Sequence, residues 1–193
     1  MSQSLEREFV IKHALECEEN LSLALSVGDA YDDLRSRLID LFLAELSSIV
    51  SRKVLPGWTV KGASGPFAAT KKLSHAVAVC FDHQTGELQV VLAGQEGRLP
   101  KQMLFWIPKD ICGLEEDEQA IVRQSVDAAV GTGTRYIDSI WCRYLSEPYS
   151  PWGSPSSILH IYRKAEWLEF FSTYLLQMTI GVDSAIRKLG LAP

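Results

Sequence analysis

The hydrophobic period changes along the chain, and the changes divide it into helical, strand and helical segments. Apolar residues recur at roughly helical spacing over 4–19 and again over 29–52. Short runs of β-branched, aromatic and aliphatic residues then occupy 58–107, and helical spacing returns over 115–130 and 164–189. This order predicts an α+β fold, in which helices flank an antiparallel sheet of about four strands.

Four runs in the centre of the chain carry the strand signal. Gly, Pro or polar turns separate these runs, and the tight link at 82–86 between two of them is typical of an antiparallel meander. The runs read WTVKGA, HAVAVCF, ELQVVLAG and QMLFWI.

The predicted helix 29–52 is apolar on two sides. One face holds Tyr31, Leu34, Leu38, Leu41, Phe42, Leu46 and Ile49, and a partial second face holds Ile39, Leu43 and Val50. Such a helix must be covered on both sides, either by its own domain or by another chain. We therefore expect a homodimer or a hetero-complex, with Ile39, Leu43 and Val50 at the interface.

The end of the chain predicts a long apolar helix over 164–189. Its aromatic and aliphatic side chains point almost all round the axis, which is typical of a helix in the middle of a structure. The whole chain, 1–193, is expected to form a single domain. Its parts would be a helical segment at 1–55, the sheet at 56–110 and a second helical segment at 111–193.

The formal net charge of −5 is distributed unevenly along the chain. Residues 1–50 hold 4 basic and 10 acidic side chains, residues 51–110 hold 8 and 4, and residues 111–193 hold 7 and 10. A nucleic-acid binder usually carries a clear basic excess, so nucleic acid is not expected as the direct ligand. The acidic N-terminal helices read as solvated faces or as a surface that mimics the charge of nucleic acid.

The cysteines and the N-terminus indicate a cytoplasmic protein. Cys17, Cys80, Cys112 and Cys142 lie far apart, without the spacing of a zinc site, so reduced thiols are favoured over a disulfide framework. The first residues do not read as a signal peptide, and no apolar run is long enough to span a bilayer.

No catalytic or metal-binding motif stands out in the sequence. GxSxG, HExxH, EF-hand and Walker patterns are absent. Asp82, Glu96 and Arg98 faintly resemble a magnesium-binding nuclease set, but Asp82 is expected at a hairpin turn opposite Glu87. Glu96 would then lie roughly 30 Å away along the strand, at about 3.3 Å per residue. We reject that site and expect no metal, no cofactor and no catalytic residue.

Several residues define a layout known from one superfamily. The pieces are Gly57 and Trp58 after the helices, Trp141 and Tyr144, then Trp152, and Asp183 in the closing helix. This layout resembles the C-terminal half of certain bacterial and phage PD-(D/E)XK nuclease-superfamily proteins, over roughly residues 20–190. In those proteins the nuclease core comes first. The resemblance implies a companion domain for recognition or assembly, and it carries over no catalytic residue.

The segment RYLSEPYSPWGSPSSILHIY, at 143–162, is the candidate partner-binding loop. Its prolines stiffen the backbone, and Tyr144, Tyr149 and Trp152 are the kinds of side chain that anchor interfaces. Trp141 is expected in the core, Trp152 is expected to pack back onto the sheet unless it serves a partner, and Tyr149 is expected to be the displayed ring.

Two functions remain open at this point. The preferred one is a non-enzymatic interaction protein that binds another protein or a nucleoprotein machine. A variant of it is a phage or mobile-element inhibitor that uses acidic helices. The alternative is an enzyme subunit, or a remnant of a nuclease system, that a partner completes.

Overall fold

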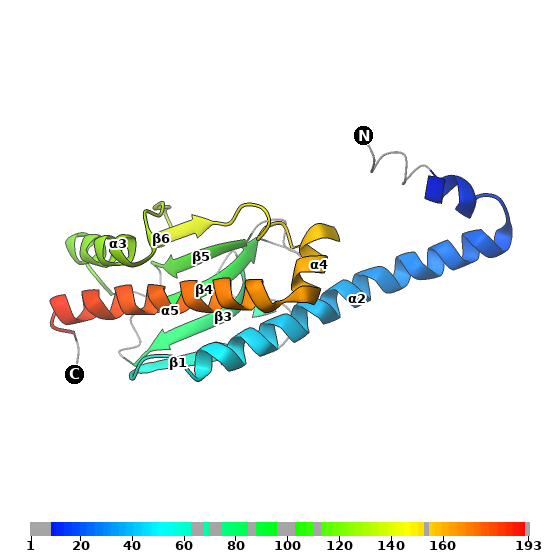
Figure 1. The fold of residues 1–193 in the computed structure, drawn as a ribbon. Coiled ribbons are helices and arrows are strands. Elements are labelled where there is room, and N and C mark those ends of the chain that lie inside the picture. The colour runs from blue at the N-terminus through cyan, green and yellow to red at the C-terminus, as the bar shows by residue number, and fades with distance from the viewer. Residues whose placement is uncertain are drawn as a thin grey trace. The chain divides into compact units, whose positions relative to one another are not determined.

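The computed structural model describes residues 9–62, 68–69, 75–84, 88–95, 103–109, 113–152 and 155–191, and it confirms the α+β class (Figure 1). The chain divides into two compact units, Met1–Arg37 and Leu38–Pro193, and helix α2 contributes residues to both. The elements are α2 Glu18–Ser51, β1 Trp58–Gly62, β2 Ala68–Ala69, β3 His75–His83, β4 Gln89–Gln95, β5 Met103–Pro108, α3 Glu116–Val130, β6 Ser139–Tyr144, α4 Pro155–Arg163 and α5 Ala165–Lys188.

The sheet is an antiparallel meander in the order β1-β3-β4-β5-β6, with the short β2 also paired to β3. The four predicted runs supply β1, β3, β4 and β5. The sheet continues into β6, whose sequence SIWCRY lies in the segment expected to be helical. Isoleucine, tryptophan and tyrosine favour a strand, and the exposed edge of β5 provides the pairing partner.

The register around Asp82 corrects the predicted hairpin. Asp82 lies inside β3 and pairs with Gln89 of β4, whereas the sequence placed it at the turn opposite Glu87. The strand runs on because the backbone N–H of His83 donates to the carbonyl oxygen of Leu88 at 3.1 Å. Glu96 and Arg98 lie outside the described residues.

The core of the second unit lies between one face of the sheet and the helices. Figure 1 shows α5 lying over the sheet, and its Phe171 packs in the same core as Phe42 of α2 and Phe105 of β5. All three rings are buried. Full burial of a side chain of this size stabilises a fold by about 1.5–3 kcal/mol, so this core is the main source of stability for the second unit.

Helix α2 corrects the prediction about its two faces. Ile39, Leu43 and Val50 were expected at an interface with another chain, but all three are buried in the core of their own chain. Leu34 and Leu41, which the sequence placed on the other face, are 56% and 61% exposed. Phe42 and Leu46 of that same face are buried, so within the second unit the face is covered only in part.

The predicted C-terminal helix at 164–189 is α5, and a separate helix, α4, precedes it in the segment predicted as a loop, with Lys164 between the two. This residue has a φ of 38°, a left-handed conformation that interrupts the helix, and α5 begins at the next residue. Lys164 also forms an ion pair with Glu45 of α2. Ile180 is 52% exposed and follows the exposed Glu166, Glu169, Thr173 and Gln177 at helical spacing, so one side of α5 is not covered.

A carboxylate holds α3 against the edge of the sheet. The Trp141 indole Nε1–H and the Gly133 backbone N–H both donate to Asp127 Oδ1, at 2.8 and 3.0 Å. Gly133 lies so close to the indole that a Cβ atom built on it would come within 2.2 Å of the Trp141 ring. Packing therefore requires glycine at position 133, which is the second glycine of the segment VGTGTRY.

We expect Gly133→Ala to lower the free energy of unfolding by about 1–3 kcal/mol, because the buried indole must move and lose its bond to Asp127. Gly113→Ala is the matched control, since a Cβ there meets nothing within 4 Å. Urea unfolding followed by tryptophan fluorescence measures both. Equal midpoints for the two variants would contradict the packing assigned to Trp141.

Candidate functional site

A polar cluster surrounds Asp82 on the sheet. Its Oδ1 accepts hydrogen bonds from Gln89 Nε2 at 2.6 Å and from Cys80 Sγ at 3.4 Å, and its Oδ2 forms an ion pair with Lys61. The register explains the cluster, because Lys61 is the cross-strand partner of Cys80, and Asp82 is the partner of both Thr59 and Gln89. These side chains therefore share one face of the sheet.

The protonation states of Lys61 and Cys80 fit a structural role for this cluster better than a catalytic one. A hydrogen bond and the charge of Asp82 raise the pKa of Lys61, so its ammonium group stays protonated. Burial, with the Asp82 charge added, raises the pKa of Cys80 far above its usual range. An amine or a thiol attacks only in its deprotonated form, so neither side chain is a nucleophile near neutral pH.

The space next to Asp82 is small and partly polar. A cavity of about 360 Å³ is lined by Thr59, Lys61, Asp82, His83, Leu88 and Gln89. Both oxygens of the Asp82 carboxylate are already engaged, by Gln89 and Cys80 on Oδ1 and by Lys61 on Oδ2. In the part of the chain that the structure describes, no group of three or more His, Cys, Asp or Glu side chains could hold a metal ion.

Trp58 and Asp183, two residues of the nuclease-like layout, both lie near His83. The rings of His83 and Trp58 meet edge to face with centroids 5.1 Å apart. Burial lowers the pKa of His83, and the nearby charge of Asp183 opposes that shift. His83 is thus a buried, neutral imidazole against an indole at neutral pH, which is the arrangement of a packed histidine.

The aromatic loop predicted to face a partner packs inward. Tyr149 stacks on Phe170 with ring centroids 3.8 Å apart and planes 10° from parallel. Trp152 is 0% exposed, meets Phe42 edge to face at 5.5 Å, and donates from Nε1 to the carbonyl oxygen of Tyr149 at 2.9 Å. The prediction of a displayed Tyr149 is wrong in this conformation, because α5 offers it an aromatic surface.

Tyr144, the third ring predicted to bind a partner, lies in β6 and is half buried. It meets Tyr136 edge to face at 5.9 Å. Partner binding by Tyr144, Tyr149 and Trp152 stays a prediction. The contacts assign Tyr149 and Trp152 a packing role, which the spacing of Trp167, Phe170, Phe171 and Tyr174 along one helix already signalled in the sequence.

The N-terminal unit presents a different surface, a row of exposed apolar side chains on α2. Leu23, Val27, Ala30 and Leu34 are all exposed and lie four, three and four residues apart; we call these four residues the α2 stripe. Nine of the fifteen large hydrophobic side chains found exposed in the described part of the chain precede Leu38. Within residues 9–37, Ser36 is the only buried residue among those whose burial is described.

Sequence reasoning left Leu23 and Val27 out of the second helix because it began that helix at residue 29. The structure begins α2 at Glu18 and carries it through Gly28. Glycine in a helix costs about 1 kcal/mol relative to alanine, which is too little to end a helix of 34 residues. The spacing of Leu23, Val27, Ala30 and Leu34 was the available signal.

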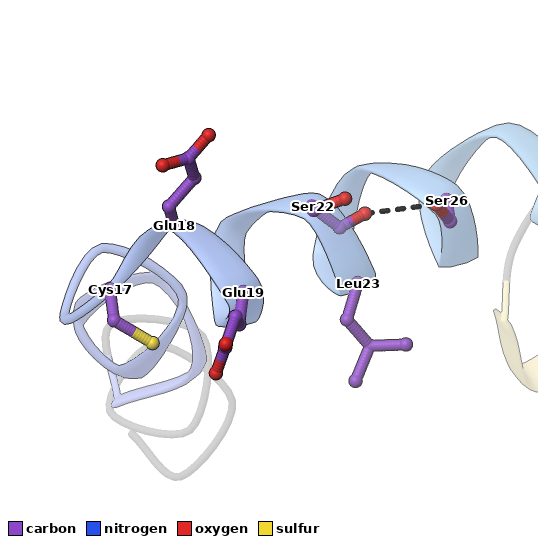
Figure 2. Close-up of a pocket in the computed structure, with 6 residues that line it drawn as sticks. All are labelled: Cys17, Glu18, Glu19, Ser22, Leu23 and Ser26. Atoms are coloured by element: carbon purple, nitrogen blue, oxygen red, sulfur yellow. Dashed lines mark hydrogen bonds between the residues drawn. The ribbon is translucent and has the colours of Figure 1, made fainter.

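A surface hollow at the start of α2 does not form a ligand site (Figure 2). It is lined by Cys17, Glu18, Glu19, Ser22, Leu23 and Ser26. Figure 2 shows the Glu18 side chain pointing away from those of Glu19 and Leu23, so the polar groups do not converge. The Ser26 hydroxyl donates to the carbonyl oxygen of Ser22 at 2.9 Å, inside the helix itself.

Comparison with protein-family models, with curated proteins and with solved structures gives no significant match. The resemblance to the accessory half of PD-(D/E)XK proteins therefore stays a prediction. In the described part of the chain, no helix has the length and apolar character needed to cross a membrane.

We expect Tyr149→Ala to lower the free energy of unfolding by about 2–4 kcal/mol, because the variant loses the stack on Phe170 and opens the core beneath it. Tyr162→Ala makes the same chemical change at a side chain that is 70% exposed, so its effect should stay within about 0.5 kcal/mol. Thermal or urea unfolding measures both variants. If the Tyr149→Ala protein were as stable as the control, the packing role of Tyr149 would be wrong and the prediction of a displayed ring would stand.

The cysteines should differ in reactivity by position. Cys17 is exposed, whereas burial raises the pKa of Cys142 to about 11 and that of Cys80 further. Thiols are alkylated as thiolates, and each pKa unit changes the thiolate fraction about tenfold. At pH 8 iodoacetamide should label Cys17 at least about tenfold faster than Cys80 or Cys142, as read by peptide mass spectrometry. Labelling in concentrated urea should equalise the rates, and equal rates in the folded protein would contradict the burial.

Proposed function

We propose that this is a non-enzymatic interaction protein, and that it binds another protein through the α2 stripe of its N-terminal unit. The observation that carries the proposal is the exposure of Leu23, Val27 and Leu34 on one helix, in a unit whose described side chains build almost no core. Burial of apolar area contributes about 25 cal/mol per Å², so this surface favours association over exposure to water.

The rest of the molecule supports binding over catalysis. Each strong polar contact around Asp82 and Asp127 is already used to hold strands and helices together. The reactive forms of Lys61 and Cys80 are disfavoured near neutral pH. A catalytic role would need groups from a partner, as in the alternative of an enzyme subunit completed by another chain.

Two features bear on the setting of the interaction. Cys17 is a free, exposed cysteine, which suits a reducing compartment such as the cytoplasm. The acidic character of residues 16–34 fits the narrower proposal of an inhibitor from a phage or mobile element, whose acidic helix would occupy a basic channel on its target.

Substitution in the α2 stripe should remove partner binding without affecting the fold. We expect Leu34→Ser to weaken binding at least about tenfold, which corresponds to roughly 1.4 kcal/mol. Leu159→Ser is the matched control, because Leu159 lies on α4 and is exposed to the same extent as Leu34, at 56%.

Quantitative affinity capture from the native host, with wild type and both variants side by side, measures this effect. Circular dichroism should first show equal helix content for the three proteins. The proposal requires at least one protein that wild type and Leu159→Ser retain and that Leu34→Ser loses. If every captured protein binds Leu34→Ser as well as wild type, the α2 stripe is not the binding surface.

A further inference from the structure

We infer that the partner supplies a basic amphipathic helix, and that this helix packs along the α2 stripe as in a coiled coil. The inference rests on the proposed function and names the chemistry of the partner. It is carried by two independent features of α2, the spacing of its exposed apolar residues and the sign of the charges beside them.

The spacing specifies another helix as the occupant. Leu23, Val27, Ala30 and Leu34 alternate steps of four and three residues, which is the pattern of a seam that faces a second helix. A strand or an irregular loop has no matching repeat of about 3.5 residues. Ala30 makes the seam shallow in its middle, so a large side chain of the partner fits there.

The charge specifies a basic partner. Residues 16–34 contain Glu16, Glu18, Glu19, Asp29, Asp32 and Asp33, and no Lys, Arg or His. In the heptad defined by the α2 stripe, Glu19 and Asp33 both take the g position beside the seam, where charges select the partner helix. Lys or Arg side chains of a partner would meet the Glu19 carboxylate.

A second copy of the chain fits this surface poorly. A second copy joined along the α2 stripe would offer no Lys, Arg or His over its own residues 16–34 to the Glu19 carboxylate beside the seam, and it would add a second acidic segment. Like charges facing each other across a helix pair destabilise it. Nucleic acid fits worse, because its phosphates carry the same sign as the helix. Charge complementarity therefore favours a different, basic chain over a homodimer along the α2 stripe.

Three synthetic peptides of about four heptads test the inference. The first has Leu at the a and d positions and Lys at e and g. The second replaces each Lys with Glu, and the third keeps Lys but has Ser at a and d. Fluorescence anisotropy with the full chain should show the Leu/Lys peptide binding at least tenfold more tightly than either of the others.

Variants of the full chain separate the two features. Leu34→Ser should weaken binding of the Leu/Lys peptide at least tenfold, whereas Leu159→Ser should leave it unchanged. Glu19→Gln should weaken it about threefold, with Glu166→Gln, an exposed glutamate on α5, as the control for charge. Raising the salt concentration should weaken binding to wild type more than to Glu19→Gln.

The outcomes distinguish this inference from the proposed function. Equal binding of the Leu/Glu and Leu/Lys peptides, or no binding of the Leu/Lys peptide, overturns the basic helix. Self-association in analytical ultracentrifugation that Leu34→Ser abolishes overturns it in favour of a second copy. In each case the proposed function stands if affinity capture finds a native partner that wild type and Leu159→Ser bind and Leu34→Ser does not. If no such partner is found, both the proposed function and this inference fail.

Discussion

The packing of Trp152 against Phe42, Trp167 and Phe171 is the contact on which the second unit depends. Trp152 comes from the loop after β6, Phe42 from α2, and Trp167 and Phe171 from α5. The centroids of the other three rings lie 5.5–6.1 Å from that of Trp152. Edge-to-face and tilted geometries at these distances are favourable beyond the area that they bury. The cluster therefore joins three segments that are distant in the sequence.

Helix α2 has a different role at each end. From Leu38 onward its Ile39, Phe42 and Leu46 fill the core, so this part of the helix belongs to the domain. Before Leu38 its apolar side chains are exposed and acidic residues stand beside them. The buried part of the helix belongs to the core of the second unit, and the exposed part is the surface proposed to bind another chain. This division connects the fold to the proposed function.

The carboxylates in the sheet and in α3 serve the fold. Asp82 joins Lys61, Cys80 and Gln89 across three strands, and Asp127 holds both the indole of Trp141 and the backbone of Gly133. The oxygens that accept these bonds are used in contacts within the fold. Acidic residues outnumber basic ones in the N-terminal unit, which is the unit proposed to bind a partner.

The sequence by itself determined the α+β class, the four central strands and the helices near 115–130 and 164–189, because periods of two and of 3.6 residues are local properties. It also showed that α2 is apolar on two sides. Only the tertiary structure decided which side is buried, since the width of the sheet and the place of α5 are set by contacts distant in the chain. The same holds for Tyr149, whose surroundings of prolines and serines suggest display. Phe170, twenty-one positions later in the sequence, covers it, and no local pattern around Tyr149 contains that residue.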